Sequence, residues 1–282
     1  MSGTDPRPDG VPLLEASGLD AGYKIGRSDA RVVVGNANFA VGPGDRVAVL
    51  GANGSGKTTL LKTCVGLIPA LGGVSLLGGH PVGRLHPRQR ARLVAWVPQI
   101  SESAWPFTVR VLVAQGRYAA RGPFSAYTGE DIDAVNAAIE RLELEELADR
   151  PFRQLSGGEA RRVLIARAVA QDTPLVALDE PAAHLDPGRQ MELLELLAEL
   201  AAEGKAIVVS LHDINAARRF AASVLLIDRS GRAHFGPPED SLRPERLEDA
   251  YDTEFLHGHH EGYGRFVLPL ARKRKGAPGS PR

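Results

Sequence analysis

The stretch GANGSGKT at residues 51–58 lies between an apolar run, DRVAVL at residues 45–50, and the sequence TTLLKTCVG at residues 58–66. It matches the complete pattern G-x-x-x-x-G-K-[ST] of a phosphate-binding loop. The apolar run predicts a strand that enters the loop, and the residues after it predict a helix that leaves it. A glycine-rich turn before a core helix is the simpler alternative, but the full motif in this context favours a phosphate site.

Each part of this loop has an expected role. The glycines let the backbone curl so that its N–H groups point at phosphate oxygens, and the positive end of the helix dipole adds to this attraction. We expect Lys57 to reach the β and γ phosphates and the Thr58 hydroxyl to ligate Mg²⁺. The residues expected to contact the nucleotide here are Gly51, Ala52, Asn53, Gly54, Ser55, Gly56, Lys57, Thr58 and Thr59.

Two further stretches indicate hydrolysis. LSGGE at residues 155–159 runs into a predicted helix at residues 158–170. Taken alone, Ser156 and Glu159 are also an ordinary capping box at the start of this helix. PLVALDE at residues 174–180 predicts a strand that ends in two carboxylates. We expect Asp179 to hold Mg²⁺ and Glu180 to act as the general base toward water. The alternative for this pair is an acidic helix start after a core strand.

The order of these motifs resembles the nucleotide-binding subunit of ATP-binding cassette (ABC) transporters. The resemblance covers residues 14–251 and includes Gln99, the HLD at residues 184–186 and His212. It implies an enzyme that hydrolyses ATP with Mg²⁺, with a P-loop NTPase core, a mostly parallel sheet, an antiparallel β layer and an inserted helical subdomain. A soluble ABC ATPase of DNA repair, chromosome or ribosome function is a second hypothesis, and a small-molecule or nucleoside kinase is a third.

The resemblance assigns roles to residues outside the phosphate loop. It implies that Tyr23 stacks on adenine, that Gln99 senses the γ phosphate and the metal, and that His212 is the switch histidine of catalysis. It also implies that Asp186 belongs to the loop that crosses the dimer. Tyr23 could instead be half in the core, Gln99 a polar loop residue and His212 a helix cap.

The chain carries one copy of each motif, so it encodes half of a dimer. In this family the LSGGE segment lies too far from its own phosphate loop to touch the same ATP. Two copies must therefore pair head to tail, with each ATP held between one loop and the partner's signature. The signature residues expected to bind nucleotide are Ser156, Gly157, Gly158 and Glu159. Arg161 and His184 depart from the usual family residues, which puts in doubt only the fine geometry of the dimer contact.

The segment at residues 104–171 narrows the resemblance to importers of iron siderophores, haem and cobalamin, although manganese and zinc importers share several of its features. Trp105, Phe107 and Tyr118 would help to dock a permease helix, or would simply pack the helical subdomain. The expected partners are a second copy, permease subunits and, indirectly, an extracellular substrate-binding protein. The HGHH at residues 257–260 is more typical of a polar tail than of a metal site.

Composition agrees with a peripheral subunit on the cytoplasmic face of the membrane. The 282 residues are 43% apolar, and no run approaches the roughly 20 apolar residues that span a bilayer. Lys plus Arg equals Asp plus Glu at 34 each, which gives no general electrostatic case for nucleic acid. No signal peptide is visible, and the single cysteine, Cys64, is consistent with a reducing cytosol.

We predict a disordered lead at residues 1–12, an ATPase domain at residues 13–252 with a helical subdomain at about residues 100–160, and an extension at residues 253–282 that ends in a solvated basic tail. Strands are expected at residues 32–34, 46–50, 74–77, 93–97, 175–178 and 206–210. Helices are expected at residues 109–118, 131–147, 213–220 and 244–251, with a hairpin at residues 228–236.

Overall fold

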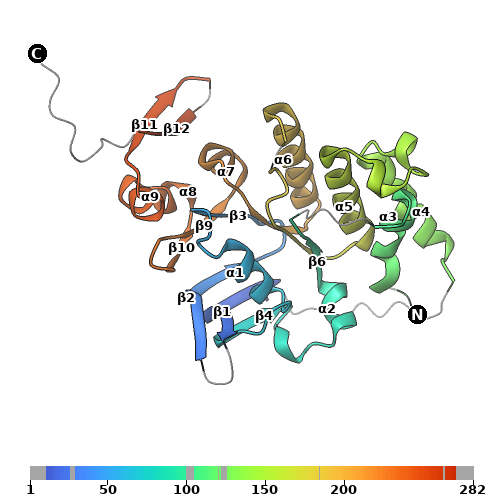
Figure 1. Cartoon of the computed structure of the whole chain (residues 1–282), viewed down its shortest axis with the longest axis horizontal. Coiled ribbons are helices and arrows are strands. Elements are labelled where there is room, and N and C mark those ends of the chain that lie inside the picture. Colours follow the sequence, from blue (N-terminus) through green and yellow to red (C-terminus); the bar gives the residue numbers. More distant parts are fainter. Residues whose placement is uncertain are drawn as a thin grey trace, which may run out of the picture.

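The computed structural model describes residues 11–25, 29–99, 105–119, 121, 126–183, 185–262 and 264–270. The predictions for a disordered lead up to residue 10, for the basic run at residues 272–275 and for His184 lie outside these residues. The described part of the chain has the α/β architecture that the motifs predicted, with two main sheets, a helical region and a C-terminal hairpin (Figure 1).

The central sheet has six strands in the order β10-β9-β3-β8-β7-β6. All neighbouring pairs are parallel except β10 with β9, which form the expected hairpin. Every residue of β7 and β8 is buried, as expected for parallel strands covered on both faces. The carboxyl ends of the parallel strands meet at one edge, where open α/β sheets bind ligands. The strand bounds are β3 (Arg46–Gly51), β6 (Val94–Val97), β7 (Leu175–Leu178), β8 (Ala206–Ser210), β9 (Ser223–Ile227) and β10 (Ala233–Gly236).

The second sheet is the antiparallel layer that the resemblance implied. Its order is β2-β1-β4-β5, formed by β1 (Leu14–Ile25), β2 (Asp29–Val41), β4 (Gly72–Leu77) and β5 (His80–Pro81). Helix α1 (Lys57–Cys64) lies between this layer and the central sheet (Figure 1). Leu60, Leu61 and Cys64 of α1 are buried in the core that the two sheets share, and burial raises the pKa of the Cys64 thiol to about 12.

The helical region packs α3, α4 and α5 against one another. The bounds are α2 (Pro87–Leu93), α3 (Val109–Ala114), α4 (Gly129–Arg141) and α5 (Gly157–Gln171), with 3₁₀ turns η1 (Val82–Arg84), η2 (Gln115–Ala119), η3 (Glu145–Leu147) and η4 (Phe152–Gln154). Trp105 packs on Phe152 with ring centroids 6.0 Å apart, and the Arg167 guanidinium lies 5.4 Å from the Trp105 ring centroid. Trp105 therefore packs within the helical region, whereas Phe107 and Tyr118 are exposed.

Two predicted helices are shorter than expected. The helix predicted at residues 131–147 ends at Arg141, because Glu143 adopts a left-handed φ of 52° and the Leu144 N–H turns back to the Ile139 carbonyl at 3.0 Å. The helix predicted at residues 109–118 is α-helical only to Ala114 and continues as η2, which lies directly against α5. A local turn thus ends the first helix, whereas the second changes to a 3₁₀ turn where it packs on α5.

Helices α6 (Pro187–Ala202) and α7 (Ile214–Phe220) pack on β8 and β3, respectively. After β10 follow α8 (Pro238–Ser241), α9 (Pro244–Tyr251) and the hairpin of β11 (Phe255–His260) and β12 (Gly264–Pro269). The Asn215 side chain on α7 anchors this hairpin: it donates to the Val267 carbonyl and accepts from the Val267 N–H, both at 2.8 Å.

The interpretation of HGHH as part of a polar tail is wrong, because these residues form most of β11. Alternating positions put Leu256 and Leu268 opposite each other on the exposed face, while Val267 faces inward and is buried. Within the described ranges, no three His, Cys, Asp or Glu side chains are arranged to hold a metal ion.

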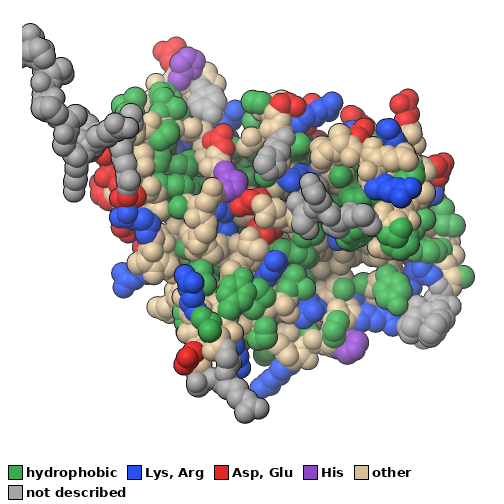
Figure 2. Space-filling model, in the orientation of Figure 1, with side chains coloured by type: hydrophobic (Ala, Val, Ile, Leu, Met, Phe, Trp, Pro, Cys, Tyr) green, Lys and Arg blue, Asp and Glu red, His purple; other side chains and the backbone are tan. Residues whose placement is uncertain are grey.

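The surface agrees with the balanced composition. Figure 2 shows basic and acidic side chains interspersed over the visible face, with apolar side chains gathered over the C-terminal hairpin. None of the helices in the described part of the chain is long and apolar enough to cross a bilayer.

We predict that Gly116→Ala destabilises the protein, because a Cβ at Gly116 would lie 2.3 Å from the Arg167 carbonyl oxygen of α5. Overpacking of this kind costs about 1–3 kcal/mol in the free energy of unfolding. Urea unfolding followed by circular dichroism measures it. The control is Gly129→Ala at the start of α4, where no described atom lies within 4 Å of the added Cβ. Equal stability of the two variants would contradict the close contact of η2 with α5.

Candidate functional site

The loop at residues 51–58 joins β3 to α1 and has the backbone that its glycines permit. The φ angles of Gly51, Gly54 and Gly56 are 151°, 78° and 104°. A Cβ at Gly51 would lie 2.5 Å from the Ser55 Oγ, and a Cβ at Gly56 would lie 2.6 Å from the Val33 Cγ1. Gly56 is also the N-cap of α1 and has no side chain to cap it, so the first N–H groups of this helix can serve an anion.

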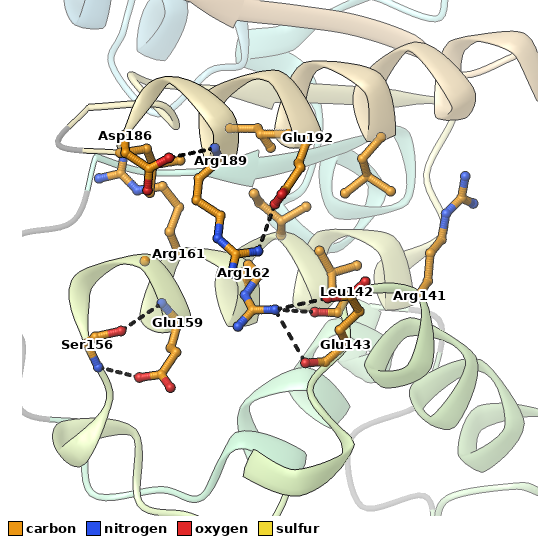
Figure 3. Close-up of a pocket in the computed structure, with 15 residues that line it drawn as sticks. Arg141, Leu142, Glu143, Ser156, Glu159, Arg161, Arg162, Asp186, Arg189 and Glu192 are labelled. Carbon is orange, nitrogen blue, oxygen red and sulfur yellow. Dashed lines mark hydrogen bonds and ion pairs between the residues drawn. The ribbon is translucent and has the colours of Figure 1, made fainter.

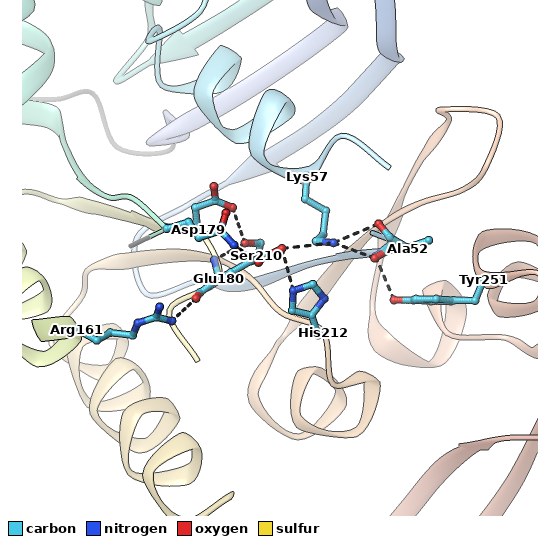
Figure 4. Close-up of polar contacts among 10 residues, drawn as sticks. Ala52, Lys57, Arg161, Asp179, Glu180, Ser210, His212 and Tyr251 are labelled. Atoms are coloured by element: carbon cyan, nitrogen blue, oxygen red, sulfur yellow. Dashed lines mark hydrogen bonds and ion pairs between the residues drawn. The ribbon is translucent and has the colours of Figure 1, made fainter. Parts of the chain in front are cut away.

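Lys57 lies inside the curl of this loop. Its Nζ donates to the carbonyl oxygens of Gly51 at 3.0 Å and Ala52 at 3.3 Å, and lies 3.8 Å from the Glu180 Oε1 (Figure 4). Burial lowers the pKa of the Lys57 ammonium, while the carboxylates of Glu180 and Asp179 act in the opposite direction. The positive charge is thus held at the point where the loop and the end of β7 meet.

The Glu180 carboxylate is the centre of the site. Gln99 follows β6, and its Nε2 donates to the Glu180 Oε2 at 2.8 Å. His212 follows β8, and its Nε2 lies 2.9 Å from the Glu180 Oε1. The structure therefore brings together all four residues predicted to be catalytic, Lys57, Gln99, Glu180 and His212. The cap proposed as an alternative for His212 is provided by Asp213, which accepts from the N–H groups of Asn215 and Ala216.

The Glu180 backbone is fixed in an uncommon conformation. Its φ is 49°, in the left-handed region that few residues other than glycine adopt. The Glu180 N–H donates to the Ser210 Oγ at 2.7 Å, and its carbonyl accepts from the Arg161 guanidinium (Figure 4). Both peptide groups of the residue are therefore held by side chains from other elements.

Asp179 offers an oxygen suited to a cation. The residue is buried, and its Oδ1 accepts from the Ser210 Oγ at 2.9 Å. Its Oδ2 is also buried and has no hydrogen-bond partner among the described residues. Buried carboxylate oxygens are normally paired, so this atom fits a metal ligand. Thr58 and Gln99, the other predicted ligands, line one cavity of about 680 Å³ together with Glu180 and His212.

Tyr23 lies beside the loop rather than in the core. Its hydroxyl is 2.8 Å from the Thr59 Oγ1, and 47% of its surface is exposed. It lines a cavity of about 320 Å³ together with Gly54, Lys57 and Thr58. Tyr23 is part of neither buried core cluster, and its contact with a nucleotide base stays a prediction that its position at the loop permits.

The signature residues lie in a different cavity. Ser156 caps α5 in a full capping box, in which the Ser156 N–H donates to the Glu159 Oε2 at 2.7 Å and the Glu159 N–H donates to the Ser156 Oγ at 3.3 Å. Hydrogen bonds from the backbone and the side chain of Ser156 to the Glu159 carboxyl lower its pKa. Asp186 caps α6 by accepting from the Arg189 N–H at 3.0 Å. Ser156, Gly158, Glu159 and Asp186 line a cavity of about 530 Å³ between α5 and α6 (Figure 3).

This separation bears on the predicted dimer. Lys57 and Thr58 line cavities beside the phosphate loop, whereas Ser156 and Gly158 line the cavity between α5 and α6. The capping box and the signature are not exclusive alternatives, since the cap fixes the start of the helix that carries Gly157 and Gly158. The two groups of predicted nucleotide-binding residues therefore line separate cavities of one chain, as the predicted head-to-tail pair requires.

Sequence reasoning missed Ser210 and Tyr251 and gave Arg161 no role in the chemistry. The Gly51 N–H, at the start of the phosphate loop, donates to the Tyr251 hydroxyl at 3.1 Å. Burial raises the pKa of Tyr251 to about 12, and its ring packs edge-on against Phe255 at 5.9 Å. A contact between residues 51 and 251 leaves no local pattern in a sequence. Ser210 could have been found, because it is a polar residue at the end of an apolar strand.

Residues 34–183 match the family model described as ABC transporter. The chain belongs to the ABC transporter family. It is an ATP-binding subunit that hydrolyses ATP, which excludes the kinase hypothesis. The hemin import ATP-binding protein of Nocardia farcinica is 42% identical to it, over 93% of this chain and 90% of the relative. A probable siderophore transport system ATP-binding protein of Bacillus subtilis is 34% identical, over 86% of each chain.

Solved structures give the same family and fold. The chain is similar to a subunit of a putative metal-chelate type ABC transporter in an inward-facing conformation, with a TM-score of 0.78, 28% identity and coverage of 93% of this chain and 99% of that one. It is also similar to a dimeric bacterial ABC transporter cassette, with a TM-score of 0.70, 27% identity and coverage of 80% and 99%.

We predict that Tyr251→Phe weakens ATP binding, because it removes the acceptor of the Gly51 N–H while keeping the packing on Phe255. The net contribution of one hydrogen bond, about 0.5–1.5 kcal/mol, corresponds to a roughly two- to twelvefold rise in Kd for ATP, measured by calorimetry. Tyr118→Phe is the control, since Tyr118 is exposed in the helical region. If Tyr251→Phe binds ATP like the wild type, the hydroxyl has no part in shaping the loop.

Proposed function

We propose that this chain is the ATP-hydrolysing subunit of an importer for an iron-siderophore, haem or cobalamin-type substrate, held at the cytoplasmic face of the membrane by permease subunits. The names of the relatives described above support the substrate class, because they are similar to this chain over most of their length. The observation that carries the catalytic role is the convergence of Lys57, Gln99 and His212 on the Glu180 carboxylate.

The chemistry assigned to the site is attack of water on the γ phosphorus of ATP. Glu180 accepts the proton of the attacking water, the bond between the γ phosphorus and the β–γ bridging oxygen breaks, and ADP and phosphate result. His212 holds the Glu180 carboxylate from one side and Gln99 holds it from the other. Lys57 supplies positive charge to the β and γ phosphates, and the N–H groups of residues 51–59 surround them.

Mg²⁺ fits the oxygen atoms at the strand ends. We assign it to the Asp179 carboxylate, with the Thr58 hydroxyl and the Gln99 amide oxygen as further ligands, because the buried Asp179 Oδ2 lacks a hydrogen-bond partner in the described ranges. The bound ion would neutralise negative charge on the β and γ phosphates. The Ser210 hydroxyl orients the Asp179 carboxylate by donating to its Oδ1.

The same proposal places adenine against the exposed ring of Tyr23 and the γ phosphate against the partner's signature helix. The free N–H groups at the start of α5 would bind that phosphate, so binding of ATP closes the pair and loss of the γ phosphate opens it. Asp186 lines the same cavity as Ser156 and would contact the partner copy. The exposed rings of Phe107 and Tyr118 are where the helical region offers apolar surface to a permease helix. An extracellular substrate-binding protein would act only through the permease.

We predict that Glu180→Gln keeps ATP binding and lowers kcat by about 100-fold or more, because the amide cannot accept a proton. With ATP but no Mg²⁺, this variant should form a dimer, and with ADP it should remain a monomer. Light scattering after gel filtration measures both states. Adding Ser156→Arg should abolish the dimer and leave the affinity for ATP unchanged. The control is Ser17→Arg on the exposed part of β1, which should leave the ATP-dependent dimer intact. A dimer that forms equally well with ADP would contradict the ATP-bridged arrangement.

We predict that a strain lacking this chain fails to grow when an iron-siderophore, haem or cobalamin is its only source of iron or corrinoid, and that the wild-type chain restores growth while Glu180→Gln does not. Uptake of the labelled substrate measures the loss directly. A defect confined to manganese or zinc would instead favour a metal-ion importer, and normal uptake of every substrate would favour a soluble ABC ATPase.

A further inference from the structure

Arg161 connects the signature helix to the residue assigned as general base. It is the fifth residue of α5, its side chain is buried with 6% of the residue exposed, and its Nη1 donates to the backbone carbonyl of Glu180 (Figure 4). In an α-helix each residue advances by about 1.5 Å, so Arg161 lies less than two turns from Ser156 on the same rigid element. One helix thus carries both the signature and a direct contact to the end of β7.

The contact acts on a backbone that needs support. A residue other than glycine with φ of 49° is strained and persists only where its surroundings hold it. The Ser210 hydroxyl holds the Glu180 N–H, and Arg161 holds the carbonyl. Because φ and ψ fix the direction of the Cα–Cβ bond, these two contacts also set where the carboxylate points.

Burying a guanidinium costs free energy, because the charge loses its hydration. Burial lowers the pKa of Arg161, which shows that its environment disfavours the charge, and the nearby Glu180 opposes this effect. An apolar side chain of similar size would pack in such a place without this cost. The charge at position 161 is therefore better explained by the residue that it touches than by the packing of α5.

We propose that Arg161 is a positioning residue that orients Glu180 and thereby couples turnover at one ATP site to the position of the signature helix. This inference rests on the proposed roles of Glu180 and of the signature in binding the partner's ATP. When the start of α5 binds the γ phosphate at the second site, Arg161 moves with this helix. Its contact with the Glu180 carbonyl then sets the orientation of the base at the first site. The two hydrolysis sites of the dimer are then linked through a single side chain in each copy.

The test compares Arg161→Met, which has no donor, with Arg161→Lys, which keeps a charged donor on a long stem. We expect Arg161→Met to lower kcat roughly 10- to 100-fold, the scale of a misplaced catalytic group. Its Kd and KM for ATP should stay within about twofold of the wild-type values, because the phosphate loop is untouched. The lysine variant should recover a large part of kcat. In the Hill plot of hydrolysis against ATP concentration, Arg161→Met should lose any cooperativity that the wild type shows.

The matched control is Arg167→Met on the same helix. Arg167 packs over Trp105 inside the helical region, and burial lowers its pKa as well. Its removal should lower the melting temperature and leave kcat unchanged. If Arg161→Met lowers the melting temperature but keeps kcat, or if Arg161→Lys is as impaired as Arg161→Met, the positioning role is wrong.

Comparison of Arg161→Met with Glu180→Gln separates this inference from the proposed function. Normal turnover in Glu180→Gln would contradict the role of Glu180 as general base, and both proposals would fail. An inactive Glu180→Gln together with a fully active Arg161→Met would overturn the role of Arg161 alone. Should Arg161→Met fail to fold, Arg161→Leu takes its place, because leucine also lacks a donor. A leucine variant with wild-type kcat would then overturn the inference.

Discussion

The attraction between the Glu180 carboxylate and the groups around it is the interaction on which the site depends. Lys57, Gln99 and His212, which follow β3, β6 and β8, each place a polar atom within 3.8 Å of the Glu180 carboxylate, which itself follows β7. They meet because the carboxyl ends of neighbouring parallel strands lie at one edge of the sheet. The sheet therefore acts as the frame of the site, and the loops contribute its charges.

Burial makes this arrangement sensitive to small displacements. Lys57 and Asp179 are almost fully buried, so each charge depends on partners that the fold provides. The left-handed backbone of Glu180 adds a local strain that must be held from both sides. A site of this kind responds to movement of any of its supports, which suits the proposed dependence of hydrolysis on binding of a second copy.

Much of the fold could be predicted from the sequence because its signals are local. The loop at residues 51–58, the apolar strands β7 and β8 and the capping box at Ser156 are each encoded within a few residues. The end of α4 depends on a left-handed Glu143, the hairpin at HGHH is held by Asn215 of α7, and the contacts of Tyr251 and Arg161 join residues that are distant in the chain. No local pattern reports them, which is why the predicted helix was too long and the predicted tail was wrong. The departure at Arg161 was visible in the sequence, but its meaning required the position of Glu180.

The buried thiol in α1 has a practical consequence for following these movements. Cys64 is the only cysteine of the chain, it is fully buried, and its pKa of about 12 keeps the reactive thiolate scarce at neutral pH. The native protein should therefore resist thiol-directed reagents while folded. A cysteine introduced on an exposed helix could carry a fluorophore or spin label at a single known position. With two cysteines introduced, the distance between the central sheet and the helical region could be measured without first removing a reactive native thiol.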